Sequence, residues 1–203
     1  MTTTIRIAAI TVLMSVAACS QAPDAPAALT TGAWTVDSDA SELSYVSIKA
    51  GEIAEANTFE TVNGSVSADG AASIEIDLAS VNTGVDIRDE RMRDVLFVVA
   101  DNPTATVTAQ IDPAGFETLG LGASTVQTLD GTVSIKGVEA PFRSEIRVTR
   151  VGVDRVLAVS NTPIILDADR FELTGGLAQL QELAGLPSIS PVVPVTFALT
   201  FER

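Results

Sequence analysis

The sequence lacks histidine altogether, and it has a single cysteine in 203 residues. Without histidine, the usual ligands of zinc and haem and the usual base of serine hydrolases are missing. One cysteine excludes an internal disulfide. Basic residues are also few, because 12 lysines and arginines stand against 26 aspartates and glutamates, for a formal net charge of −14. This acidity argues against nucleic acid as a partner and against electrostatic attraction to anionic lipid headgroups.

Aromatic residues are scarce as well, at 4% of the chain, whereas hydrophobic residues of all kinds make up 46%. The hydrophobic fraction is rich in valine, isoleucine and alanine, and the β-branched residues among them favour strands. A chain of this length can form one domain with a sizeable core. The composition therefore favours a single domain built mainly of β-structure.

The N-terminal residues 1–18 have the pattern of a lipoprotein signal peptide. Arg6 supplies the positive charge, and residues 7–16 form an apolar run too short for a bilayer, which takes about 20 apolar residues. Residues 16–19, VAAC, resemble a bacterial lipobox, so we expect Cys19 to carry diacylglycerol. Ordinary cleavage after small residues is the alternative. Ser20 favours sorting to the outer membrane, on the periplasmic side of the bacterial envelope.

The segment after the cysteine, residues 19–32, contains two prolines, several alanines and no long apolar run. This composition predicts a flexible tether. A diacylated cysteine would supply the two chains that stable anchoring to a membrane requires. We expect the folded domain to occupy residues 33–203.

Alternation of apolar and polar residues predicts a series of strands separated by turn signals such as Asp69-Gly70. The predicted strands span residues 34–37, 41–49, 62–67, 73–79, 104–111, 125–138, 141–150, 153–160 and 193–201. The polar residues 49–58 are assigned no strand. Strands at intervals of about ten residues indicate an antiparallel barrel or sandwich. The last strand has the cleanest alternation, and we expect it to close a barrel against an early strand.

Two short segments have helical rather than strand patterns. Residues 86–94 hold seven charges and follow the turn signal at 82–84, so a short amphipathic helical turn is predicted there. Leucines recur at helical spacing in residues 177–186, where Gly175-Gly176 marks the start of a helix and Gly185-Leu186-Pro187 marks its stop. This second helix is either a lid over a cavity or a satellite packed on the barrel.

Several motifs, taken in order, resemble the YceI-like family. They are SVNTG at 80–84, RDERMR at 88–93 with Phe97, WTVD at 34–37, SELSY at 41–45, Phe59 with Gly64, NPT at 102–104, and Gly131 with Gly137 and Val138. The family consists of lipocalin-like antiparallel barrels, several of which bind polyisoprenoid chains. The resemblance thus implies an all-β, antiparallel lipocalin-like β-barrel of about eight strands with one or two short helices. Histidines common in relatives are missing beside Ser41 and at Lys136, so no headgroup contact made by them carries over.

The inward faces of the predicted strands are aliphatic. We expect the ligand-lining residues to be Ile74, Ile76, Leu78, Val107, Ala109, Val133, Val195, Phe197 and Leu199, with Ile111 and Ile135 on the same faces. An eight-stranded barrel either fills its interior with side chains or holds one small ligand. A wall of this kind suits a long hydrocarbon.

The expected ligand is a polyisoprenoid or an isoprenoid quinone, held without a metal or another cofactor. The expected function is that of a carrier or sequestering protein, not an enzyme, and the oligomeric state is open. The alternatives are a ligand-free structural or interaction module of the cell envelope and, less favoured, an enzyme with paired carboxylates.

Three clusters of polar residues could carry other chemistry. The charged residues Arg88, Asp89, Glu90 and Arg91 either form a loop ion-pair network or place an arginine on a ligand's polar oxygen, and the four acids among seven charges favour the network. Asp167 and Asp169 suggest calcium, but the glycine and distal glutamate of a calcium loop are missing. Ser134 and Lys136 could form a catalytic dyad, although two polar residues on a solvated strand face are far commoner.

Overall fold

A computed structural model of the chain describes Leu29 and residues 32–203. The predicted signal peptide, the predicted lipid attachment at Cys19 and nearly all of the predicted tether lie outside the described residues. Within the described part, no helix is long and apolar enough to cross a membrane.

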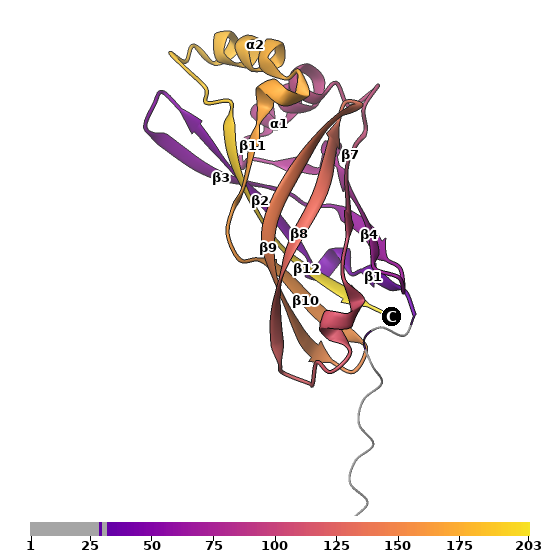
Figure 1. The fold of residues 1–203 in the computed structure, drawn as a ribbon. Coiled ribbons are helices and arrows are strands. Elements are labelled where there is room, and N and C mark those ends of the chain that lie inside the picture. The colour runs from indigo at the N-terminus through magenta and orange to yellow at the C-terminus, as the bar shows by residue number, and fades with distance from the viewer. Residues whose placement is uncertain (1–28, 30–31) are drawn as a thin grey trace, which may run out of the picture.

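The described residues form twelve strands that are joined in one antiparallel sheet (Figure 1). The strands are β1 (Trp34–Val36), β2 (Glu42–Lys49), β3 (Ile53–Phe59), β4 (Val62–Val66), β5 (Ala71–Asp77), β6 (Val81–Asn82), β7 (Thr104–Gln110), β8 (Ser124–Ile135), β9 (Val138–Gly152), β10 (Arg155–Ser160), β11 (Ile164–Asp167) and β12 (Val192–Glu202). Four pairs of short strands each act as one bent strand of the barrel. In the first pair, β1 and β2 both lie along the same edge of β12. The second pair, β3 and β4, lies beside the first, because β3 pairs with β2 and β4 pairs with β1.

The same relation joins β5 to β6 and β10 to β11, so the twelve strands amount to an eight-stranded up-and-down barrel. Strand β12 closes it, because its registers Phe201↔Val36 and Val195↔Tyr45 join it to the first two strands. Each of the eight strands pairs with a neighbour on both sides over part of its length. The prediction of an all-β, antiparallel barrel closed by the C-terminal strand is confirmed.

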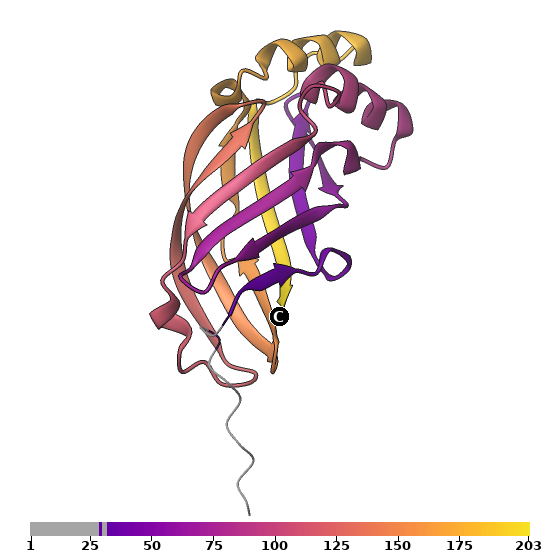
Figure 2. The ribbon, with the colours of Figure 1, turned by 90° about the vertical axis from the view of Figure 1, so that its right-hand side faces the viewer.

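Two helices cover one end of the barrel (Figure 2). Helix α1 (Asp86–Arg91) continues into a π-helical turn, Met92–Phe97, and α2 (Thr174–Ala184) lies beside it. Helix α2 ends at Gly185, which has a φ of 62° and so occupies the left-handed conformation that glycine adopts without a Cβ clash. Both predicted helical segments are therefore present, and α2 starts three residues before the predicted range.

Several buried side chains pack together at the opposite end of the barrel. The Trp34 indole donates a hydrogen bond to the Leu29 carbonyl oxygen at 2.8 Å, and both residues are buried. Phe116, in the 3-10 turn Pro113–Phe116, is buried at this end, and the buried Arg150 guanidinium donates to the Leu119 carbonyl oxygen. This network fixes the turn against the barrel rim.

Three strands were not predicted, and one of them is the two-residue β6. Strand β3 occupies residues assigned no strand, because its inward positions carry Glu55 and Asn57, while its outward positions carry alanine and threonine. Such a strand has no apolar alternation for a pattern to detect. Strand β11 has only four residues, and it forms by pairing with β12 across Ile164↔Val195.

Candidate ligand cavity

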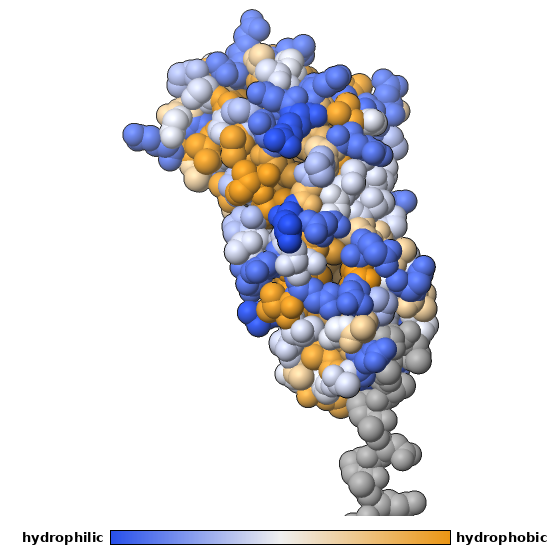
Figure 3. Space-filling model, in the orientation of Figure 1, coloured by the Kyte–Doolittle hydropathy of each residue, from blue (hydrophilic) through white to orange (hydrophobic). Residues whose placement is uncertain are grey.

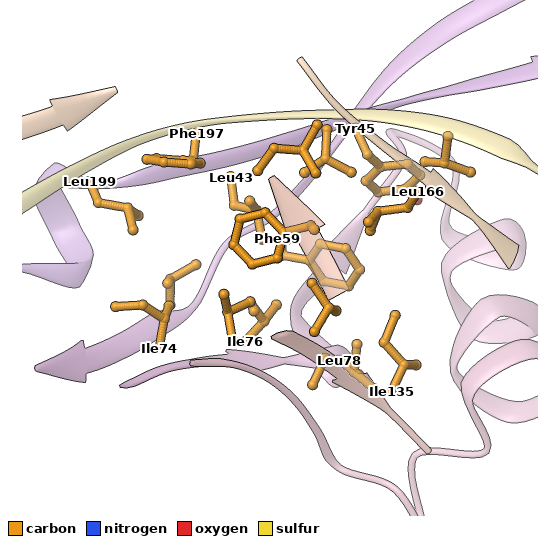
Figure 4. Close-up of a pocket in the computed structure, with 18 of the residues that line it drawn as sticks. Leu43, Tyr45, Phe59, Ile74, Ile76, Leu78, Ile135, Leu166, Phe197 and Leu199 are labelled. Carbon is orange, nitrogen blue, oxygen red and sulfur yellow. The ribbon is translucent and has the colours of Figure 1, made fainter. Parts of the chain in front are cut away.

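The barrel encloses a cavity of about 630 Å³, which extends from Leu29 and Phe116 at one end to the helices at the other. Figure 4 shows Ile74 and Ile76 of β5, and Leu78 just after β5, across the lumen from Phe197 and Leu199 of β12. The structure places all nine predicted ligand-lining residues in the wall of this cavity: Ile74, Ile76, Leu78, Val107, Ala109, Val133, Val195, Phe197 and Leu199. The interior is hollow and not filled by side chains.

The wall is apolar because alternate residues of neighbouring strands point inward in register. Ile74 pairs with Val107 and Ile76 with Ala105 between β5 and β7, and Val107 in turn pairs with Val133 of β8. All of these residues line the cavity. Cross-strand pairs of this kind stabilise the sheet and form a continuous aliphatic surface.

Aromatic rings narrow the cavity toward the helical end. The Tyr45 and Phe59 rings are 5.5 Å apart between centroids, and the Phe59 and Phe97 rings are 5.9 Å apart. The Tyr45 hydroxyl donates to the Met92 sulfur at 3.4 Å. Burial raises the pKa of Tyr45 above its ordinary value of 10.0, so the phenol stays neutral.

Next to the aromatic rings, the apolar wall gives way to a group of polar side chains, which we call the polar corner: Ser47, Lys49, Glu55, Asn57 and Arg88. Glu55 Oε2 accepts from Lys49 Nζ at 2.8 Å and from Arg88 Nη1 at 2.6 Å. These partners, Lys49 first and then Arg88, hold the pKa of Glu55 below its ordinary value of 4.5. The Glu55 carboxylate is therefore ionised and shared between two cations.

Two atoms of the polar corner have no hydrogen-bond partner, and they are the only such buried side-chain atoms in the described part of the chain. They are Asn57 Oδ1 and Arg88 Nε. The Asn57 amide nitrogen donates to Ser47 Oγ and to the Glu55 carbonyl oxygen, both at 3.1 Å. An unsatisfied buried polar atom destabilises a fold by about 1–3 kcal/mol, which singles out this corner.

The predicted loop ion-pair network takes a different form, since no ion pair in the described residues joins two of Arg88, Asp89, Glu90 and Arg91. Arg88 pairs with Glu55 on β3, which belongs to another part of the barrel. The buried Asp89 accepts from the Thr83 backbone and hydroxyl, so it fixes the turn before α1. Arg91 donates to the Leu183 carbonyl oxygen of α2 at 3.3 Å, and Glu90 is exposed.

Helix α2 covers the cavity directly. The helix contributes three residues to the lining at this end of the cavity: Leu177, Leu180 and Ala184. Gly176 allows the close approach to the π-helical turn, because a Cβ there would lie 3.1 Å from the Leu96 Cα.

The cavity reaches the surface at this end, because the exposed Val85 and Ile87 are among the lining residues. Figure 3 shows hydrophobic side chains gathered under α2, beside β11 and the β2–β3 hairpin. The exposed apolar residues of these elements include Leu183 of α2, Ile165 of β11 and Ile53 of β3, none of which lines the cavity. The opening itself is bordered by the apolar side chains of Val85 and Ile87.

The other candidate clusters are structural. Asp167 Oδ1 accepts from the Asp169 backbone N–H, and Asp169 Oδ1 accepts from the Thr174 hydroxyl at the start of α2. Among the described residues, no group of three or more acidic, histidine or cysteine side chains is placed to hold a metal ion. Lys136 lies in the β8–β9 turn, and Ser134 lies between two cavity-lining residues of β8, so it faces outward.

Comparisons with known proteins agree with the barrel fold. A family model for the YceI-like domain matches residues 34–201. A polyisoprenoid binding domain from Saccharophagus degradans, implicated in plant cell wall breakdown, has 35% sequence identity and a TM-score of 0.82, over 85% of this chain and 99% of that one. BcnA from Burkholderia cenocepacia has the same fold at 21% identity, with a TM-score of 0.64, over 81% of this chain and 98% of that one. Among curated proteins, no sequence matches the chain.

Proposed function

The chain belongs to the YceI-like domain family, and from this premise we propose that its barrel holds one apolar chain-like ligand, a polyisoprenoid or an isoprenoid quinone. The observation that carries the proposal is the hollow apolar cavity of about 630 Å³. Its volume is in the range of small-molecule sites. The similar domain from Saccharophagus degradans is described as polyisoprenoid binding, which supports the same class of ligand here.

An aliphatic wall binds by burial and not by hydrogen bonds. Each Å² of apolar surface removed from water contributes about 25 cal/mol, so a chain that buries ~300 Å² gains roughly 7 kcal/mol before the cost of ordering it. Such a gain is non-directional, so it favours length and apolarity over any particular functional group. A flexible hydrocarbon chain fits these requirements better than a polar metabolite does.

A carrier or sequestering role is supported by a cavity that reaches the surface. The mouth lies beside α1, where the exposed lining residues Val85 and Ile87 would meet a chain as it enters. We expect binding without catalysis. The side chains that face the cavity offer no nucleophile paired with a base, and the polar corner is tied into hydrogen bonds and ion pairs.

We further propose that the protein is exported and anchored by a diacylated Cys19, on the periplasmic side of the envelope and in the outer membrane. The support is the sequence pattern around Cys19 and Ser20. Strand β1, the first element of the barrel, lies at the end opposite α1 and α2 (Figure 1). An anchor at residue 19 would thus attach to the end of the barrel that lies far from the mouth.

Uptake from vesicles tests the proposed ligand class. Delipidated protein is incubated with donor vesicles that contain a polyprenol and a menaquinone, separated from them, and extracted with organic solvent for mass spectrometry. We expect close to one chain lipid per protein. A folded protein that takes up neither lipid would instead favour the ligand-free module of the envelope.

A further inference from the structure

The unsatisfied amide oxygen of Asn57 lies in the wall of the ligand cavity. Asn57 is only 3% exposed, and it lies on β3 between Glu55 and Phe59, both of which line the same cavity. Its cross-strand partner Tyr45 also lines the cavity. Because residues i and i+2 of a strand face the same side, the Asn57 side chain points inward.

The orientation of the Asn57 amide is set by its neighbours. The amide nitrogen donates to the backbone carbonyl oxygen of Glu55, which can only accept a hydrogen bond. A flipped amide would place two acceptors against each other, so the side-chain nitrogen must face Glu55. The free atom is therefore an acceptor, Oδ1, and only a donor can satisfy it.

The second unsatisfied atom is a donor. Arg88 uses Nη1 on the Glu55 carboxylate and Nη2 on the Thr83 carbonyl oxygen, both at 2.6 Å, which leaves Nε without a partner. In the polar corner, Asn57 Oδ1 thus lacks a hydrogen-bond donor, and Arg88 Nε lacks an acceptor. Both residues are bonded to Glu55, so both unmet requirements belong to the same corner of the cavity.

The polar corner holds two cations and one ionised carboxylate, and that carboxylate engages both cations. Lys49 Nζ and Arg88 Nη1 each contact Glu55 Oε2. The remaining cation in the cavity wall, Arg91, lies at the rim against the Leu183 carbonyl oxygen. A ligand group at Asn57 Oδ1 would meet an acceptor that carries partial negative charge, which favours a neutral donor over an anion.

We propose that the polar corner binds the polar end of the ligand, and that this end is neutral and carries a hydroxyl or N–H donor. A hydroxyl can donate to Asn57 Oδ1 and accept from Arg88 Nε. Quinone carbonyls and ionised phosphates are acceptors only, so they leave the asparagine unsatisfied. Because Oδ1 has no exposed area in the unliganded chain, neighbouring side chains shift when the ligand binds. This inference rests on the proposed function, since it names the headgroup of the same chain-like ligand.

Four ligands with one common chain test the inference. Geranylgeraniol, its methyl ether, geranylgeranyl diphosphate and the menaquinone with a geranylgeranyl chain compete with a fluorescent prenyl probe for the delipidated full-length protein. The ether keeps the oxygen acceptor of the alcohol, but it replaces the hydroxyl proton, which is the donor, by a methyl group. We expect the alcohol to bind roughly 10-fold more tightly than the other three, as one hydrogen bond to a buried acceptor implies.

The variant Asn57→Ala should lower the affinity for the alcohol to that for the ether and leave the affinity for the ether unchanged. Asn63→Ala, on the exposed outer face of β4, is the matched control and should change neither. Equal binding of alcohol and ether by the wild type, or tightest binding of the diphosphate or the quinone, overturns the inference and leaves the proposed function standing. A folded wild type that binds none of the four overturns both. If Asn57→Ala does not fold, the four affinities of the wild type decide alone.

Discussion

The same substitution at two phenylalanines should have unequal effects on stability, because one ring is almost fully buried and the other is only half-buried. Phe171, in the 3-10 turn Ala168–Phe171, belongs to the cavity wall, but it is 2% exposed and packs among core residues. Phe197, in the middle of β12, lines the same cavity and is half-buried. Replacing each by alanine therefore compares a tightly packed site with a more open one within a single fold.

The magnitudes follow from what each substitution removes. At Phe171, alanine loses the burial of the ring and leaves a new void, so we expect a loss of about 3–5 kcal/mol. At Phe197 the vacated space joins a cavity of about 630 Å³ that exists already, so no new void is created. Only the lost burial of part of the ring lowers the unfolding free energy, and we expect it to fall by roughly 1–2 kcal/mol.

Urea denaturation of the two delipidated variants, followed by circular dichroism, measures both losses. A domain of this size shifts its Tm by about 2–4 °C per kcal/mol, so thermal melts should separate the variants clearly. The slopes of unfolding free energy against urea should stay equal to that of the wild type. If Phe197→Ala costs as much as Phe171→Ala, the interior is packed in solution and the reasoning from an open cavity is refuted.

Three further variants test other parts of the account. Ala109→Trp should obstruct the lumen and abolish lipid uptake, and it should lower the unfolding free energy by less than the ~1–3 kcal/mol of an overpacked core. The control Ala56→Trp, at an exposed and outward-facing position, should leave uptake intact. Unchanged uptake by Ala109→Trp would mean that the chain binds elsewhere. Because the folded-state pKa of Glu55 is lowered, chiefly by Lys49, the stabilising effect of its carboxylate is present above pH 4.5 and is lost as the pH falls through the lowered value. Glu55→Gln should therefore have a lower Tm than the wild type at neutral pH and the same Tm in acid. A difference in Tm that stays constant with pH would contradict this. Cys19→Ser should move the protein from the membrane fraction to the soluble fraction, and a wild type that is already soluble and carries no acyl mass would exclude lipidation.

The sequence allowed the barrel and most of its wall to be predicted because both depend on alternation. In β12, Val195, Phe197 and Leu199 share one face, and the inward direction of that face follows from the period of a strand. Whether the interior is hollow could not be predicted, because a cavity depends on how far the facing walls stand apart. The aliphatic residues of a filled core and of a hydrocarbon-binding cavity are the same types.

The polar corner was missed for a related reason. Glu55 and Asn57 occupy inward positions of β3, and polar residues at such positions hide the strand from a search for hydrophobic alternation. Arg88 was singled out from its local charges, but its partner Glu55 lies 33 residues away in the chain. Only the pairing of β3 with β2 and the placement of α1 over the same end bring the two together.

Native mass spectrometry of the full protein tests the central claim most directly. The protein is recovered from its own host under non-denaturing conditions, and bound ligand is released and identified in the gas phase. We predict one adduct per protein with the mass of a chain lipid, absent from Ala109→Trp. A wild type that shows only the mass of the unliganded chain, and that still shows only this mass after incubation with a polyprenol, would contradict the claim that the barrel holds an apolar chain.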